Sequence, residues 1–356
     1  MADVARIRAV AERVVATRRT GVDVVVVVSA MGNTTNELLA LASEISSKPG
    51  RRELDLLISV GERVSMTLLA MAIEDLGEPA QSFTGSQSGI ITDTQHVSAQ
   101  VVEVRPHRIR RALNEGRIAI VAGFQGVSRT GEVTTLGRGG SDTTAVVLTA
   151  ALGADHCEIC SDVDGVYSAD PRSVSSAEKM DELTLGSALA MARAGSKVLL
   201  ADALEQAERH GVTLVAGATD KPSGVGTRLP PGDISDHVIS IAVDAQVFLV
   251  ESGESMDTCG GAIRARLMDG RILVDGRNLP DPDQWGMSNA PRPVAAVSVI
   301  GRSVVSDPAV MAKAHDVVQS IDPEGIVWAT GGVLTAVVER PLANGIEVEL
   351  HRSLIG

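Results

Sequence analysis

Residues 116–123 read Gly-Arg-Ile-Ala-Ile-Val-Ala-Gly, an apolar run that a glycine bounds at each end. A second run, residues 22–29, reads Val-Asp-Val-Val-Val-Val-Val-Ser. Continuous apolar strands are typical of parallel sheets, in which helices cover both faces. We therefore predict that both runs are buried strands of one parallel sheet.

Helical patterns surround these two strands. Between Asp3 and Arg19 the apolar residues recur at the spacing of an amphipathic helix, and Gly21 ends it. Asn33-Thr34-Thr35 offers N-cap chemistry for a helix over 37–45, and residues 51–76 predict one or two helices with a break near Ser59. The remaining elements alternate in the same way: strands at 132–135, 156–161 and 212–216, and helices at 143–152, 187–194 and 201–210. This alternation is the signature of an α/β fold.

A linker rich in Gly and Pro follows at 221–232, and the pattern changes beyond it. We predict a domain over 1–232 and two small α+β modules at about 233–292 and 293–356. The first module shows short strands around a weak helix, at 238–243, 247–250 and 271–274. The second shows strands at 294–300, 326–329 and 333–339, and helices at 307–321 and 342–354.

The composition excludes several classes of function. Net charge is −13 and the sequence pI is about 5.0, which argues against a nucleic-acid partner or an anionic membrane surface. The apolar run at 24–28 is too short to span a bilayer, and the N-terminal pattern is amphipathic and unlike a signal peptide. Three cysteines do not make a disulfide framework, so we expect a cytoplasmic protein.

Cys157 and Cys160 form a C-x-x-C pair within the strand predicted at 156–161. Strand residues three apart point to opposite faces, which does not suit a metal or redox pair. We predict ordinary buried cysteines and no metal site.

The first candidate site is Ser29-Ala-Met-Gly-Asn-Thr-Thr35, where a predicted strand ends and a helix begins. Free backbone N–H groups, the helix dipole and the hydroxyls of Ser29, Thr34 and Thr35 would favour a bound anion. An ordinary helix cap explains the same residues.

The second is Leu136-Gly-Arg-Gly-Gly-Ser-Asp142. Its glycines allow close approach of a ligand, and Arg138 can bind a carboxylate through two hydrogen bonds, with Asp142 at the helix start. The segment is not a Walker A loop, because the Lys-Ser/Thr ending is absent. The alternative is a turn with an exposed arginine and an aspartate cap.

The third is Ser161-Asp-Val-Asp-Gly-Val-Tyr-Ser-Ala-Asp-Pro-Arg172, which follows a strand at the edge where open α/β sheets bind ligands. Its spacing does not match an EF-hand. A nucleotide fits better, with Tyr167 at the base, Asp162 at the ribose or hydrated Mg²⁺ and Arg172 at phosphate. The alternative is a polar surface loop.

Together these segments resemble the aspartokinases of the amino acid kinase family. The resemblance covers nearly all of residues 1–230 and depends on the three segments above together with Val60-Gly-Glu-Arg-Val-Ser65 and Gly195-Ser-Lys-Val-Leu199. It implies a three-layer sandwich with a mainly parallel central sheet, followed by two ACT-like modules in a degenerate form. Pro-Gly, which the family has at the first ACT helix, is absent from residues 251–261.

The resemblance also implies a reaction and a site. Aspartokinases transfer the γ-phosphoryl group of MgATP to the side-chain carboxylate of aspartate, a step of amino-acid biosynthesis. By match to the family motifs, Glu62 pairs with the substrate ammonium, Arg138 with its α-carboxylate, and Thr34 helps to hold it. Asp142 orients polar groups at the reacting centre, and Ser29 faces the phosphates. The nucleotide site comprises Ser161, Asp162, Tyr167, Arg172 and Lys197.

Family members begin with a strand ending in Lys-Phe/Tyr-Gly-Gly, whose lysine stabilises the migrating phosphoryl group. The present sequence starts at the helix that follows that strand. Two hypotheses result: an active aspartokinase whose start lies upstream, or a catalytically impaired homologue. The latter would bind an amino acid or nucleotide, act on another substrate, or serve as a partner subunit. In either case we expect a homodimer formed through the C-terminal modules.

Overall fold

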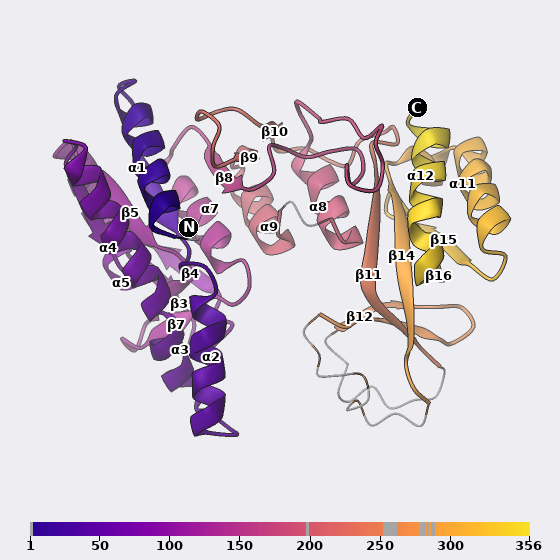
Figure 1. Cartoon of the computed structure of the whole chain (residues 1–356), viewed down its shortest axis with the longest axis horizontal. Coiled ribbons are helices and arrows are strands. Elements are labelled where there is room, and N and C mark those ends of the chain that lie inside the picture. Colours follow the sequence, from indigo (N-terminus) through magenta and orange to yellow (C-terminus); the bar gives the residue numbers. More distant parts are fainter. Residues whose placement is uncertain are drawn as a thin grey trace. The chain divides into compact units, whose positions relative to one another are not determined.

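The computed structural model describes residues 3–196, 199–251, 262–277, 279, 282, 285 and 289–356. The chain forms two compact units: Met1–Gly165 with Leu199–Pro231, and Val166–Val198 with Gly232–Gly356. The predicted linker end near residue 232 coincides with one border of these units. Residues 166–196 belong to the second unit, so the functional domain boundaries drawn from the sequence stay a prediction. The predicted fold class, α/β with additional α+β sheets, is confirmed (Figure 1).

A parallel sheet forms the centre of the first unit. Strand β5 (Ile118–Ala122) lies between β1 (Val25–Val28) and β2 (Ala80–Phe83) and pairs in parallel with both. Every residue of β5 is fully buried. The prediction of a buried strand at 116–123 is therefore confirmed.

The prediction for residues 22–29 needs a correction. The strand is only four residues long, and Val28 is its one buried residue, whereas Val25, Val26 and Val27 are half-buried. Among the described residues β1 pairs with β5 alone, which makes it an edge strand. An edge strand lacks a neighbour that would shield its second side, so the apolar run is less buried than predicted.

A second three-stranded sheet of this unit has a similar edge. Its order is β10 (Thr227–Leu229), β9 (Leu214–Ala218), β8 (Cys157–Ser161), with β8 and β9 parallel. In the part of the chain that the structure describes, β8 pairs only with β9. Helix α7 (Gly140–Leu152) packs against both β1 and β8, so the two edge strands share one covering helix.

Successive side chains of β5 point to opposite faces of the sheet, and helices cover both faces. Ile118, Ile120 and Ala122 join the core beneath α1 (Val4–Arg18) and α4 (Val60–Asp75). Ala119 and Val121 face the opposite core, which includes residues of α6 (His107–Asn114) and α7. The predicted N-terminal helix is confirmed, and Asp3 caps it: the Asp3 carboxylate accepts the Arg6 N–H at 2.8 Å.

Before residue 232 the predicted elements occur in the predicted order, whereas the elements at 80–114, 125–128 and 227–229 were not predicted. The apolar stretch at 51–76 breaks at Ser59, as predicted, into two helices. The elements not yet named are α2 (Thr34–Ile45), α3 (Arg51–Ile58), α5 (Gly85–Ser88), α8 (Leu185–Ala194), α9 (Ala201–His210) and a four-stranded sheet ordered β4 (Val101–Val104), β3 (Ile90–Thr92), β6 (Gln125–Ser128), β7 (Val133–Thr135).

The second unit contains a six-stranded antiparallel sheet. Its order is β12 (Ile263–Arg266), β13 (Ile272–Asp275), β11 (Ser240–Val250), β14 (Arg292–Ile300), β16 (Val333–Glu339), β15 (Ile326–Thr330). Strands of both predicted modules thus share one sheet, because β11 pairs with β14.

Helices α11 (Pro308–Ile321) and α12 (Ala343–Leu354) pack side by side over one face of this sheet (Figure 1). The short elements α10 (Ser303–Ser306) and η3 (Arg340–Leu342) complete the fold. The two strands predicted at 238–243 and 247–250 form a single strand, β11, with a register shift between Asp244 and Val247. The weak helix expected before residue 271 falls largely on residues 252–261, which lie outside the described residues.

One helical stretch, Arg51–Asp75, is long and apolar enough to cross a membrane by length and composition. It is interrupted at Ser59, and it buries the carboxylates of Asp55 and Glu62. Leu69 and Ile73 of this stretch lie fully buried in the core below the parallel sheet. These features are typical of the core helices of a globular unit.

The α4 core contact can be tested with two adjacent leucines. Leu69 is fully buried, whereas Leu68 is 37% exposed on the same helix. We expect Leu69→Ala to lower the free energy of unfolding by about 3 kcal/mol, because it removes buried methyl groups and leaves a cavity. Leu68→Ala should cost about 1 kcal/mol or less. Chemical denaturation of both variants measures the difference, and equal losses would contradict the packing described.

Candidate functional site

Glu62 is a buried carboxylate in the first turn of α4. Its side chain is 3% exposed, and Oε1 accepts the backbone N–H of Ala30 at 3.1 Å. The other oxygen, Oε2, is also buried and has no hydrogen-bond partner in the described part of the chain. Burial raises the pKa of Glu62, although its own N–H and that of Ala30 oppose this shift. A buried carboxylate oxygen without a donor is costly, so this geometry suits a ligand that brings a cation.

Gly61 allows Glu62 to reach the segment after β1. A Cβ at Gly61 would lie 2.7 Å from the Ala30 Cβ and 3.6 Å from Thr34 Cγ2. Any larger residue at 61 would push α4 away from residues 29–35. The structure therefore brings together Glu62 and Thr34, two predicted substrate-binding residues that are 28 positions apart in sequence.

The loop at 136–142 starts at β7 and leads into α7. Gly137 and Gly139 adopt φ values of 78° and 74°, a region that favours glycine. Arg138 is exposed and has no hydrogen bond or ion pair among the described residues. Asp142 lies half-buried in the first turn of α7, and burial raises its pKa. An exposed cationic side chain and a desolvated carboxylate thus occupy one short loop.

This loop and the segment after β1 lie at the same end of the parallel sheet. The N–H of Gly123, just after β5, donates to the carbonyl of Val28 at 3.0 Å. A Cβ at Gly123 would lie 2.7 Å from Ser141 Oγ, so the start of α7 packs directly on the end of β5. Ser29 follows Val28 and is exposed there. Ligand sites of open α/β sheets occur at the carboxyl ends of the strands, and this end carries both segments.

Local hydrogen bonding at 33–36 differs from the predicted N-cap chemistry. Asn33 occupies the cap position of α2, but its side chain makes no cap hydrogen bond and accepts from Asn36 Nδ2 at 2.6 Å. The Thr34 hydroxyl donates to the carbonyl of Met31 at 2.7 Å. The prediction of a side-chain cap at these residues is wrong, because each side chain binds within its own turn.

The predicted nucleotide residues are divided between the two units. Ser161 ends β8 in the first unit, and the Val163 N–H donates to its Oγ at 3.0 Å, while Asp162 follows the strand and is exposed. Tyr167 and Arg172 belong to the second unit, where Arg172 Nη2 donates to Asp170 Oδ2 at 2.7 Å. Lys197 lies outside the described residues.

Comparison with known proteins identifies the family of this chain. The model of the amino acid kinase family matches residues 1–216. The aspartokinase of Corynebacterium glutamicum is 43% identical over 378 residues, which cover 94% of this chain and 89% of the relative. The chain belongs to the amino acid kinase family, among its aspartokinases.

Other relatives align with a smaller share of this chain. The aspartokinase of Mycobacterium tuberculosis is 56% identical over 228 residues, which cover 63% of this chain and 54% of the relative. The match thus spans about half the length of the mycobacterial aspartokinases. The crystal structure of E. coli aspartokinase III in complex with aspartate and ADP aligns with a TM-score of 0.79 at 22% identity, over 97% of this chain and 96% of that one. That likeness supports the fold.

In this aspartokinase homologue the structure also shows a buried aspartate near the candidate site that the sequence analysis missed. Asp55, on α3, is fully buried, and its carboxylate accepts the Thr135 hydroxyl at 2.5 Å and the Val97 N–H at 3.0 Å. Its Oδ2 lies 2.6 Å from Nδ1 of His96. Val97 has φ of 75°, which a β-branched residue adopts only when its surroundings enforce it. The available signal was an aspartate within the apolar pattern of helix 51–58.

The Asp55 network connects α3 to β7, and β7 leads into the loop that carries Arg138 and Asp142. A Cβ at Gly137 would lie 3.4 Å from the carbonyl oxygen of Val97, so the strained turn also packs against this loop. Asp55 therefore acts as a support for the start of the 136–142 loop.

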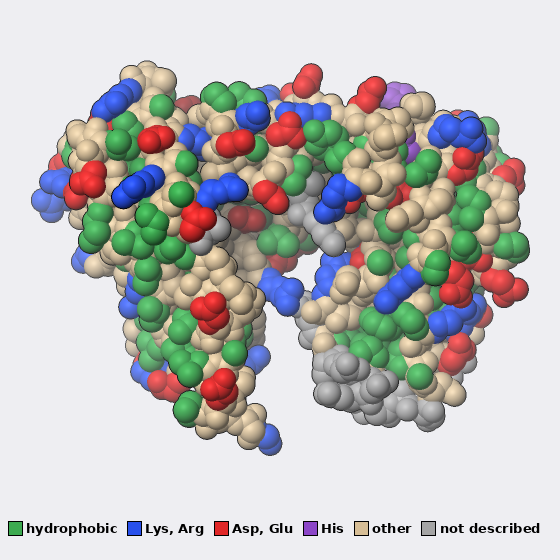
Figure 2. All heavy atoms as spheres, viewed as in Figure 1, with side chains coloured by type: hydrophobic (Ala, Val, Ile, Leu, Met, Phe, Trp, Pro, Cys, Tyr) green, Lys and Arg blue, Asp and Glu red, His purple; other side chains and the backbone are tan. Residues whose placement is uncertain are grey.

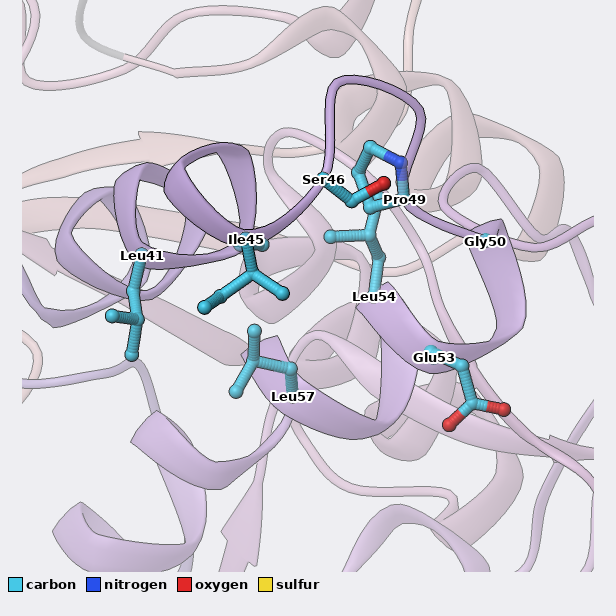
Figure 3. Close-up of a pocket in the computed structure, with 9 residues that line it drawn as sticks. Leu41, Ile45, Ser46, Pro49, Gly50, Glu53, Leu54 and Leu57 are labelled. Atoms are coloured by element: carbon cyan, nitrogen blue, oxygen red, sulfur yellow. The ribbon is translucent and has the colours of Figure 1, made fainter.

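An apolar groove of about 410 Å³ lies between α2 and α3 (Figure 3). Leu41 and Ile45 of α2 face Leu54 and Leu57 of α3 across it. Leu41 and Ile45 are 52% and 84% exposed, and Figure 2 shows hydrophobic side chains scattered over this part of the surface. None of the predicted site residues that the structure describes lines the groove, so it is separate from them.

The two cysteines of the C-x-x-C pair differ in burial. Cys157 is buried, which raises its pKa to about 12. Cys160 is exposed, and Arg13 Nη1 approaches its sulfur at 3.3 Å. The prediction that both are buried is wrong for Cys160, because residues three apart on β8 face opposite sides. Within the described ranges, no three His, Cys, Asp or Glu residues are grouped to hold a metal ion.

The contribution of Asp55 to the free energy of unfolding can be measured. We expect Asp55→Ala to lower the free energy of unfolding by about 3 kcal/mol, because it leaves three buried or strained groups without their acceptor. Glu53→Ala, an exposed carboxylate on the same helix paired with Arg52, should cost about 0.5 kcal/mol. Urea denaturation of the two variants provides the comparison. If Asp55→Ala lowered the free energy of unfolding no more than Glu53→Ala does, the Asp55 network would not stabilise the fold.

Proposed function

We propose that the chain transfers the γ-phosphoryl group of ATP to the side-chain carboxylate of aspartate. The observation that carries the proposal is Oε2 of Glu62, which is buried and finds no hydrogen-bond partner among the described residues. An amino acid supplies the missing donor through its ammonium group, with which a carboxylate makes a charge-assisted hydrogen bond. The E. coli neighbour solved with aspartate and ADP is consistent with this choice of ligands.

Three residues recognise the amino acid in this proposal. Glu62 binds the ammonium group, and the exposed guanidinium of Arg138 binds the α-carboxylate through two parallel hydrogen bonds. Thr34, which lies close to Gly61, borders the same space. Opposite charges at two points fix the orientation of the ligand, so that its side-chain carboxylate points away from both.

The chemistry needs little from the protein besides position and charge. A side-chain carboxylate is ionised at neutral pH, so it attacks phosphorus without a general base. Ser29, exposed at the end of β1, donates to a phosphate oxygen, and Asp142 orients polar groups near the reacting centre. Mg²⁺, held through ATP phosphates and water, would neutralise charge on the phosphoryl group. Ser161, Asp162, Tyr167, Arg172 and Lys197 are the proposed nucleotide residues.

A second candidate function is that of a catalytically impaired homologue, which binds an amino acid or nucleotide, acts on another substrate, or serves as a partner subunit. The edges of β1 and β8 bear on both candidate functions and do not decide between them. Both strands are parallel edge strands among the described residues, and α7 covers both. A further strand there would extend the sheet and bring its own end residues to the site. Loss of one transition-state cation costs about 10²–10³-fold in rate, which would distinguish this candidate from an active enzyme.

We also propose a cytoplasmic homodimer formed through the C-terminal modules. Net charge of −13 supports a protein without nucleic-acid partners. Sedimentation equilibrium of the purified chain tests the dimer.

Turnover decides between the two candidate functions. In the presence of hydroxylamine, aspartate and MgATP, we expect formation of aspartyl hydroxamate that depends on all three substrates. Rates of about 1–100 s⁻¹, as in other kinases, would support the active enzyme. A rate reduced about 10²-fold or more, together with retained aspartate binding, would favour the impaired homologue. Equal rates with glutamate in place of aspartate would contradict the proposed substrate.

The amino-acid site can be tested without turnover. We expect Glu62→Gln to weaken aspartate binding by about 100-fold in calorimetry, because the substrate ammonium loses its buried ionic partner. Arg138→Ala should weaken it by a similar factor through the loss of the α-carboxylate contact. Glu74→Gln, on an exposed position of α4, is the matched control and should leave affinity unchanged. Unaltered aspartate affinity in Glu62→Gln would show that the site is misplaced.

A further inference from the structure

Helix α12 carries two buried titratable side chains that the proposed reaction does not use. Glu347 is 2% exposed and His351 is 1% exposed, and they lie one turn apart. Burying such groups costs free energy unless each polar atom finds a partner. Both find their partners in residues 166–180, the segment that follows β8 and packs within the second unit.

His351 has a serine hydroxyl at each ring nitrogen. Nε2 lies 2.8 Å from Ser168 Oγ, and Nδ1 lies 3.4 Å from Ser176 Oγ. Burial lowers the pKa of His351, which favours the neutral ring with one donor and one acceptor nitrogen. A serine hydroxyl can meet either role, so this imidazole connects two points of the 166–180 segment.

Glu347 contacts the same segment between those two points. Its carboxyl group accepts hydrogen bonds from the backbone N–H of Asp170 and from the Ser173 side chain. Burial is the main reason that its pKa rises to about 7, and the nearby Asp170 carboxylate adds to the effect. The Asp170 carboxylate in turn binds Arg172 at 2.7 Å. Glu347 therefore fixes the backbone at the residue that holds Arg172.

The 166–180 segment has a short ladder of its own. The Ser168 N–H donates to the carbonyl of Glu178 at 2.9 Å, and the Met180 N–H donates to Val166 at 2.9 Å. Tyr167 lies within this ladder and bridges to Lys179. The ladder fixes the two ends of the segment, whereas the turn between them depends on the contacts with α12.

We propose that Glu347 and His351 are positioning residues, which hold the 166–180 segment in the conformation that binds the nucleotide. This inference rests on the proposed function, in which Tyr167 and Arg172 contact ATP. It assigns to the C-terminal helix a direct effect on nucleotide affinity. The amino-acid site, built on Glu62 and Arg138, does not depend on these two side chains.

The charges around Glu347 give the inference a pH dependence. The titratable groups near it are Asp170 and Arg172 on the segment and His351 on α12, and Glu178 lies near His351. When pH rises through about 7, Glu347 loses its proton and a second negative charge appears beside Asp170. The contact weakens as a result, so ATP affinity should fall between pH 6 and pH 8. Glu347→Gln, which stays neutral, should remove this dependence.

The experiment uses the full chain with three substitutions on α12. Glu347→Ala removes the acceptor, Glu347→Gln retains an acceptor oxygen, and Glu349→Ala is a matched control two residues away, where the side chain instead pairs with Arg352. Hydrogen–deuterium exchange of peptides within 166–180 reports how far contacts with α12 stabilise the conformation of the segment. Steady-state kinetics and ATP calorimetry report its effect on the nucleotide.

We expect exchange in 168–176 to accelerate by about 10-fold in Glu347→Ala, and to stay at the wild-type rate in Glu349→Ala and Glu347→Gln. The KM or Kd for ATP should rise by about 10-fold in Glu347→Ala, while the KM for aspartate and kcat change less than about 2-fold. Unchanged exchange, or an equal rise in both KM values, would overturn the inference. If the wild type binds no ATP, the proposed function fails, and with it the nucleotide role, whereas the exchange result still decides the hold on the segment.

Discussion

The hydrogen bond between Glu62 and the Ala30 N–H is the contact on which the candidate site depends. It joins the first turn of α4 to the chain just after β1, and Gly61 permits it by leaving room for Ala30. The helix N-terminus and this donor stabilise the carboxylate, but within the described part of the chain one of its oxygens is buried without a partner. A fold that needed α4 only for packing would place an apolar residue there. A ligand that brings a cationic group would supply the missing partner.

Strand β5 determines where that carboxylate meets the rest of the site. Its alternate residues join two separate cores, so helices are fixed on both faces and the strand cannot shift its register without exposing one set. The chain turns at Gly123 directly against Ser141, at the start of α7. The glycine-rich loop and the segment after β1 are therefore brought to one end of the sheet by backbone packing, before any ligand is present.

Elements with strong local signals could be predicted from the sequence, whereas features set by distant neighbours could not. The break at Ser59 and the buried strand β5 follow from patterns within about ten residues. The exposure of β1 depends on what pairs with its second side, and five valines in a row carry no information about that partner. Asp55 reads as a surface residue of an amphipathic helix until Thr135 and Val97, more than forty residues away, supply its donors. Likewise, one motif contains both Ser161 and Tyr167. It gives no sign that the two residues belong to different units of the structure.

This passage of the chain between units explains why the C-terminal unit buries two titratable side chains on α12. The 166–180 segment is covalently continuous with β8, yet its turn obtains hydrogen bonds from Glu347 and His351. An apolar α12 face would leave the Asp170 N–H and the Ser168 and Ser173 hydroxyls without these partners, at a cost that buried polar groups rarely bear. Any rearrangement of α12 on its sheet must therefore either break these hydrogen bonds or carry the segment along. A helix far from the reacting groups in sequence is thereby coupled to the tyrosine and arginine of the Asp-Val-Asp-Gly-Val-Tyr motif by contacts that need no ligand to form.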